Sequence, residues 1–164
     1  MKKVFLFSIA FLTLSIAASA QKSADNKAAE LANRFFNAPA QGNTAAVLDE
    51  ILAPNFKSEH FPPPSGSTKA EYIEGIKGFL NAFPDTKITV LKQFGKGNQV
   101  FSYGFIEATH KGSFKDIPAT DKKVHITFMD IWTEKEGKLI YNEVVMDMAG
   151  LMQQLTTTQG AEKK

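Results

Sequence analysis

The sequence predicts an α+β domain in which N-terminal helices pack on one face of a mainly antiparallel sheet. Before Pro84 the apolar residues recur with the 3.6-residue period of a helix. After Pro84 they alternate with the two-residue period of a strand, in segments rich in β-branched and aromatic residues that glycine-containing turns separate. Helices followed by a run of such strands are typical of this fold class.

Three helices are expected in the first half of the chain. The first is expected to end near Pro39, and the second, capped by Asn43, is expected to stop before Pro54. Thr68 and Glu71 have the spacing of a capping box, which predicts the start of the third helix. The proline-rich segment 61–66 is expected to form a loop. The later elements are predicted as strands at 87–94, 99–110, 124–133 and 139–147 and a helix at 148–155.

The first 20 residues have the order of parts of a secretory signal peptide. Lys2 and Lys3 are followed by an apolar run, Val4 to Ile16, and by the small residues Ala18-Ser19-Ala20. The run is short for a bilayer span, although an uncleaved anchor is the alternative. We therefore expect an exported protein, periplasmic or secreted, with one domain at 21–164, flexible ends at 21–26 and 156–164, and no stable membrane anchor after cleavage.

Composition excludes several classes of function. Without the two leader lysines the chain has as many basic as acidic residues, and Arg34 is its only arginine, so no nucleic-acid partner is expected. The absence of cysteine excludes a disulfide, a thiol nucleophile and a thiolate metal site. His60, His110 and His125 are too scattered for a usual metal-binding spacing, so we expect neither a metal nor a cofactor.

Five motifs carry a family resemblance. In the order of the chain they are A-F-P-D at 82–85, T-H-K-G-S-F at 109–114, I-P-A-T at 117–120, E-G-K-L at 136–139 and D-M-A-G-L-M-Q-Q-L at 147–155. The sequence resembles the SnoaL-like polyketide cyclases, a branch of the nuclear-transport-factor-2-like superfamily that also includes the ketosteroid isomerases. Ala119 and Glu136 replace the proline and aspartate that are usual there. The resemblance implies a cone-shaped fold with a curved sheet around a ligand pocket, and a possible homodimer.

The resemblance also locates the expected chemistry. In the characterised cyclases an aspartate near the end of the last strand, helped by a histidine on the preceding strand, transfers the proton. An alignment through Gly137 and Lys138 places Val144 at the aspartate position and Asp130 at the histidine position. Whether the chain is an enzyme therefore stays open.

Asp130 is the candidate catalytic acid or base. It shares one face of its strand with Phe128 and Trp132, because side chains alternate with period two. If this face lines the cavity, burial is expected to raise the pKa of the carboxyl group and make it a stronger base. The alternative is a structural aspartate whose oxygens are satisfied by hydrogen bonds or by water.

Four other residues join Phe128 as candidate ligand contacts. A hairpin that pairs Thr133 with Leu139 would place Asn142 opposite Asp130 and Val144 opposite Phe128. Trp132 and His60 complete the set, with an ordinary loop histidine as the alternative for His60. A tyrosine could also polarise a ligand carbonyl, but the spacing of Tyr72, Tyr103 and Tyr141 does not indicate which of them would do so.

The leading functional hypothesis is an apolar pocket that binds a small hydrophobic carbonyl or polycyclic compound. Asp130 would carry out cofactor-free cyclisation, isomerisation or hydrolysis of that compound. The alternative is a non-catalytic module on the same fold that binds a small ligand or another protein. Substituting Asp130 by asparagine discriminates between them, because only an enzyme loses turnover.

Overall fold

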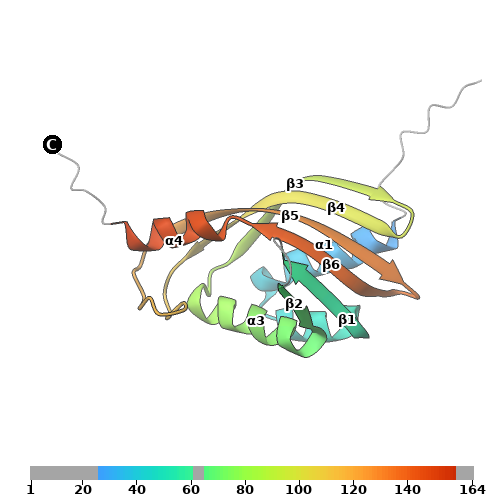
Figure 1. Cartoon of the computed structure of the whole chain (residues 1–164), viewed down its shortest axis with the longest axis horizontal. Helices are drawn as coiled ribbons and strands as arrows, with labels where there is room; N and C mark the ends of the chain where they lie inside the picture. Colours follow the sequence, from blue (N-terminus) through green and yellow to red (C-terminus); the bar gives the residue numbers. More distant parts are fainter. Residues whose placement is uncertain (1–25, 61–64, 158–164) are drawn as a thin grey trace, which may run out of the picture.

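The structure of the chain is a computed structural model, which describes residues 26–60 and 65–157. The expected signal peptide and most of both expected flexible ends lie outside these residues. The described part contains four helices and six strands (Figure 1). They are α1 (Lys27–Gln41), α2 (Thr44–Ile51), β1 (Leu52–His60), β2 (Ser65–Thr68), α3 (Lys69–Ala82), β3 (Lys87–Lys96), β4 (Gln99–Thr109), β5 (Lys123–Lys135), β6 (Lys138–Met146) and α4 (Met148–Thr156).

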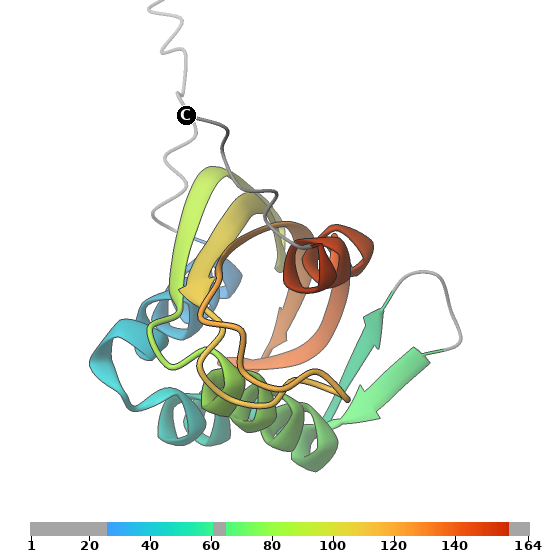
Figure 2. The same ribbon diagram turned by 90° about the vertical axis from the view of Figure 1, so that its left-hand side faces the viewer.

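The strands form one sheet in the order β2-β1-β6-β5-β4-β3. All neighbouring strands are antiparallel except β1 and β6, which are parallel. The sheet curves strongly, and α1, α2 and α3 lie on its concave side, while α4 follows β6 at one end (Figures 1 and 2). The expected α+β arrangement with a mainly antiparallel sheet is therefore confirmed.

Aromatic side chains fill the space between α1, α3 and the sheet. Phe35 of α1 packs edge-on against Trp132 of β5, and Phe36 packs against Phe128 of the same strand. Tyr72 of α3 contacts Trp132 with its ring nearly perpendicular. These large buried side chains contribute apolar area that stabilises a chain without disulfides.

The helix boundaries expected from proline and asparagine are close to the observed ones. α1 includes Pro39 and ends at Gln41, because Gly42 adopts the left-handed conformation and donates its N–H to the carbonyl of Pro39. Asn43 occupies the N-cap position of α2, but its side chain makes no capping hydrogen bond. The capping box of α3 is confirmed, since Thr68 and Glu71 exchange both of its hydrogen bonds.

Strands β1 and β2 were not predicted from the sequence. β1 begins directly after α2 and contains Pro54, and β2 includes Ser65 and Gly66 from the segment expected to be a loop. Proline is tolerated here because it lies close to the start of β1, where the register to β6 shifts between Leu52 and Lys57. The parallel pairing of β1 with β6 joins residues that are far apart in the sequence, so no local pattern reveals it.

The expected register of the β5–β6 hairpin is wrong by two residues. Glu136 and Gly137 both have positive φ and form a tight turn that pairs Lys135 with Lys138. A register shift follows next to Glu134, and Asp130 then lies opposite Val144 instead of Asn142. A shift of two residues keeps every side chain on its expected face, so the predicted inward face of β5 is confirmed.

Two of the family-like motifs join the end of α3 to the end of β4. Asp85 accepts hydrogen bonds from the backbone N–H and the hydroxyl of Thr109, both at 2.6 Å. The backbone N–H groups of Lys111 and Gly112 both donate to the carbonyl of Ala82. A Cβ atom at Gly112 would lie 2.5 Å from the carbonyl oxygen of Asn81, so this approach requires glycine.

The last motif shapes α4. Asp147 caps the helix by accepting a hydrogen bond from the backbone N–H of Gly150 at 2.8 Å. A Cβ atom at Gly150 would lie 2.1 Å from a carboxylate oxygen of Asp147. Gln154 exchanges two hydrogen bonds with the backbone of His125, which ties α4 to β5. These residues of the motif thus stabilise the fold.

The convex face of the sheet exposes several large apolar side chains. Phe94 is 63% exposed and stacks on Phe101, and Met129 and Val145 are about half exposed. The expected homodimer stays a prediction. Among the residues that the structure describes, no helix is both long enough and apolar enough to cross a bilayer.

Candidate active site

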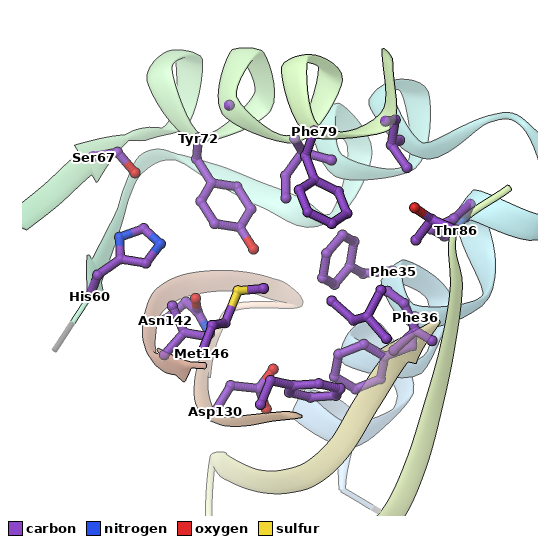
Figure 3. A pocket seen from close by; sticks show the side chains of 18 of the residues that line it. Phe35, Phe36, His60, Ser67, Tyr72, Phe79, Thr86, Asp130, Asn142 and Met146 are labelled. Atoms are coloured by element: carbon purple, nitrogen blue, oxygen red, sulfur yellow. The ribbon is translucent and has the colours of Figure 1, made fainter. Parts of the chain in front are cut away.

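A cavity of about 340 Å³ lies between the concave face of the sheet and helices α1 and α3. Its walls are mainly aromatic and aliphatic (Figure 3). The phenylalanines of the lining are Phe35, Phe36, Phe79, Phe114 and Phe128. A concave apolar space with a few polar groups is the usual form of a small-molecule site, and this volume lies at the lower end of the range for ligand pockets.

Asp130 forms the polar floor of this cavity. β5 directs its carboxylate inward, and the residue is only 5% exposed. Oδ2 accepts a hydrogen bond of 2.8 Å from the indole N–H of Trp132, which lies two residues along the same face. Oδ1 is also buried and has no hydrogen-bond partner among the described residues. An unsatisfied buried carboxylate oxygen is costly, which makes it a strong acceptor for a ligand or for a proton.

Burial raises the pKa of Asp130 to about 7. The indole of Trp132 and the polar atoms of Ser102, which lies opposite Asp130 on β4, act in the opposite direction but do not cancel the effect of burial. A carboxyl group with a pKa near neutrality exists in both protonation states at physiological pH. It therefore has the property that a general acid or base needs.

Tyr72 of α3 directs its hydroxyl group into the cavity from the side opposite Asp130 (Figure 3). Burial, and secondarily the charge of Asp130, raise the pKa of the tyrosine far above its ordinary value. The hydroxyl group therefore stays protonated and can donate a hydrogen bond. Sequence reasoning did not single out Tyr72, because its position facing Asp130 depends on how α3 packs over the sheet.

Asn142 of β6 is buried and lines the same cavity. Its Oδ1 accepts a hydrogen bond of 3.2 Å from the hydroxyl of Ser58 on β1, and its Nδ2 donates to the carbonyl of Ile131 at 3.4 Å. These contacts fix the amide in place. Asn142 is thus a positioned polar group beside the ligand space, although its cross-strand partner is Trp132 and not Asp130.

Polar groups also surround the end of the cavity next to β1 and β2. His60, at the end of β1, lines the cavity, and its ring extends toward that space (Figure 3). Ser67 of β2 has a buried hydroxyl group without a hydrogen-bond partner among the described residues. The cavity therefore combines an apolar region near α1 and the end of α3 with a polar region that extends from Asp130 to His60.

The structure brings most of the predicted site residues together. Asp130, Asn142, Phe128, Val144 and His60 all line the cavity. The placement predicted for Trp132 is wrong. Its indole does not line the cavity, because Phe35, Phe56 and Tyr72 cover it. Trp132 instead acts on the site through its hydrogen bond to Asp130.

The other two histidines lie outside the cavity lining. His125 points outward, where its ring stacks on Phe105. His110 is buried against Phe83 and contacts the hydroxyl of Thr120 at 3.0 Å, as expected for a histidine that stabilises a turn. Burial lowers the pKa of His110. Within residues 26–60 and 65–157, no group of three or more histidine or acidic side chains is close enough to hold a metal ion.

Titration of Asp130 is expected to change the fluorescence of Trp132. The chain has a single tryptophan, and its indole donates directly to the carboxyl group. We expect the emission of the folded protein to shift with a midpoint of about pH 7, because Asp130 loses its proton there. The transition should vanish in Asp130→Asn and persist in Asp116→Asn, a control on an exposed loop. A transition that survives in Asp130→Asn would belong to another group.

Comparison with known proteins agrees with this architecture. The sequence matches the family described as SnoaL-like polyketide cyclase over residues 30–155. No curated protein sequence matches the chain significantly. Among solved structures, a Jannaschia sp. CCS1 protein named as a SnoaL-like polyketide cyclase has a TM-score of 0.74 and 18% identity, over 80% of this chain and 93% of its own.

Two further structures are also similar. AclR of Streptomyces galilaeus, named as a hydroxylase, has a TM-score of 0.72 and 19% identity, over 79% of this chain and 95% of its own. A SnoaL-like polyketide cyclase of Agrobacterium tumefaciens strain C58 has a TM-score of 0.61 and 16% identity, over 77% of this chain and 96% of its own. At such identities the structures establish the fold alone. The family match over residues 30–155 shows that this chain belongs to the SnoaL-like polyketide cyclase family.

Proposed function

We propose that this chain is an exported, cofactor-free enzyme that binds a small hydrophobic carbonyl compound, monocyclic or polycyclic, and uses Asp130 as its acid and base. The observation that carries the proposal is the buried carboxylate at the floor of an apolar cavity, with one oxygen free of hydrogen bonds from the described residues. Membership of the SnoaL-like polyketide cyclase family supports the choice of ligand class. The leader-like N-terminus supports export.

The proposed step is transfer of a proton from the carbon next to a ligand carbonyl. Oδ1 of Asp130 takes the proton, and the electron pair of the broken C–H bond moves onto the carbonyl oxygen to give an enolate. The hydroxyl of Tyr72 donates a hydrogen bond to that oxygen and stabilises the charge that develops on it. The protonated Asp130 then returns the proton to another carbon of the ligand. Alternatively, the enolate carbon attacks a second carbonyl of the same molecule and closes a ring, and Asp130 gives its proton to the alkoxide oxygen that this attack forms.

A cavity with this lining favours proton transfer in both directions. Since the pKa of Asp130 is about 7, neither the acid nor the base form dominates near neutral pH. The apolar walls also lower the local polarity, which strengthens the hydrogen bonds that hold the reacting oxygen. Hydrolysis of a lactone is a third reaction open to the same carboxylate. Asp130 would take a proton from a water molecule that attacks the lactone carbonyl, and would return it to the ring oxygen as the ring C–O bond breaks.

The alternative proposal is a module that binds the ligand without converting it. The feature that favours it is Val144, which occupies the position where the resemblance places the aspartate of characterised cyclases. Val144 lies directly opposite Asp130 and has no group that transfers protons. Both proposals need the same cavity and differ only in turnover.

A thermal-shift screen tests for the ligand. The chain from Gln21 to Lys164 is screened against small ketones, lactones, steroids and aromatic polyketide-like compounds. A compound at about 100 times its dissociation constant should stabilise the folded state by about 2.7 kcal/mol. Shifts confined to one chemical class would support a working pocket. No shift across the whole library would contradict both the enzyme and the small-ligand module.

Asp130→Asn then separates the enzyme from the binding module. Asparagine has the same shape, so ligand affinity should change by less than about threefold, whereas turnover of a ligand that the wild type converts should fall by about 10² to 10⁴. Tyr72→Phe is expected to lower turnover less, because only a hydrogen bond to the developing charge is lost. Asp116→Asn serves as the control with full turnover. Unchanged turnover in Asp130→Asn would remove Asp130 from the mechanism.

A further inference from the structure

Helix α3 has two glycines in its interior, Gly75 and Gly78. Glycine is the poorest helix former apart from proline, so an interior glycine in an exposed position needs a reason. Neither residue has a positive φ, and a Cβ atom built at either position would meet no other atom within 4 Å. Backbone geometry and close packing therefore do not explain why these residues are glycine.

The two glycines differ in what they face. Gly75 lines the cavity and is also exposed to solvent, so it lies where the cavity opens to the outside. Gly78 is exposed as well but does not line the cavity. The empty space next to Gly75 is consequently part of the mouth of the site, whereas the space next to Gly78 is open solvent.

Helix geometry shows what a side chain at position 75 would do. Residues four apart lie one above the other on a helix, so Glu71, Gly75 and Phe79 form one row along α3. Glu71 and Phe79 both line the cavity. A side chain between them would continue this row across the mouth and narrow it.

We propose that Gly75 is the specificity-determining residue at the mouth of the cavity, which admits ligands long enough to reach from Asp130 to the solvent. This inference rests on the proposed function, because it assumes that the cavity binds an apolar carbonyl compound. To the proposed function, the inference adds a minimum length and an orientation for that compound. The ligand enters with its oxygen-bearing end first and leaves its far end at Gly75.

The distribution of polar groups supports this orientation. Asp130 and the hydroxyl of Tyr72 lie deep in the cavity, and both residues are at least nine-tenths buried. Ile76 and Phe79 are only partly buried and line the cavity on the same stretch of helix as Gly75. An aryl or fused-ring ketone therefore places its carbonyl near Asp130 and Tyr72, and its rings extend between apolar side chains to the mouth.

The matched pair Gly75→Leu and Gly78→Leu tests the proposal. The probe is Prodan, a naphthyl ketone whose emission shifts to the blue in apolar surroundings, and acetophenone is the small ketone for comparison. Binding of acetophenone is followed by the fluorescence of Trp132. Both variants lose a helix glycine, so both should melt at the same temperature as the wild type or about 2–4 °C higher.

We expect Gly75→Leu to weaken the binding of Prodan about tenfold or more, while Gly78→Leu binds it like the wild type. Acetophenone should bind both variants within about threefold of the wild type, because it fits inside the mouth. Equal Prodan affinity in the two variants would overturn the role of Gly75 and leave the proposed function intact. If the wild type bound neither ketone, the proposed function would fail and the inference with it.

Discussion

Replacing Asp130 by asparagine is expected to remove a large pH-dependent loss of stability. In the unfolded chain the carboxyl group has a pKa near 3.8, whereas burial raises the pKa of the folded group to about 7. Between these values the folded state binds more protons than the unfolded state, so stability falls as pH rises. Above about pH 7 both states are ionised and the loss is complete. Between these two pKa values the free energy of unfolding falls by about 4 kcal/mol in total.

Asparagine has no proton to lose and keeps an oxygen that can accept from the indole of Trp132. The free energy of unfolding of Asp130→Asn should therefore rise relative to that of the wild type between about pH 4 and pH 7, and the difference should then stay constant. Urea denaturation at a series of pH values between about 4 and 9 measures this difference directly. Asp116→Asn is the control, since it changes an exposed aspartate. A constant difference between wild type and Asp130→Asn would show that the carboxyl group is not desolvated as the structure indicates.

Replacing Gly104 by alanine is expected to be the most damaging small substitution in the sheet. Gly104 lies in β4 between Val90 of β3 and Phe128 of β5. A Cβ atom there would lie 2.1 Å from the carbonyl oxygen of Thr89 and 3.1 Å from two ring atoms of Phe128. A backbone oxygen cannot move away without displacing β3, so we expect a loss of about 3 kcal/mol or more.

The same change should also alter the cavity, because Phe128 is part of its wall. The added methyl group pushes the ring toward the ligand space, so affinity for Prodan should fall together with stability. Gly78→Ala is the control, since it adds a methyl group where no atom lies within 4 Å and should stabilise the helix by about 0.5–1 kcal/mol. Equal stability of Gly104→Ala and wild type would mean that β3 can move away from β4 at little cost in free energy.

The sequence predicted the fold class and the faces of the strands because both depend on local periodicity. The alternation from Val124 to Trp132 directs one set of side chains inward whatever the register is. The exact pairing was not predictable, because the positive φ of Glu136 and the register shift beside Glu134 depend on the folded hairpin. β1 was missed for a similar reason, since Pro54 and the polar residues after it lack a strand pattern and pair only with distant β6.

The candidate site shows the same limit. Asp130 and Asn142 could be predicted because each is a polar residue within a strand whose inner face is otherwise apolar. Tyr72 and Gly75 could not, because their roles depend on how α3 lies across the sheet. The helix period places both residues on α3 but does not indicate which of them faces Asp130 and which lies at the mouth.

The direct pairing of Asp130 with Val144 has an evolutionary consequence. Every codon for valine becomes a codon for an acidic residue by a change of its second base. One mutation therefore separates this cavity from one with two facing carboxyl groups, and no rearrangement of the strands is needed. Two acids that face each other on neighbouring strands would titrate as a coupled pair. A site with one acid can thus evolve into a site with two acids, or the reverse, by a substitution at position 144 that leaves the rest of the core unchanged.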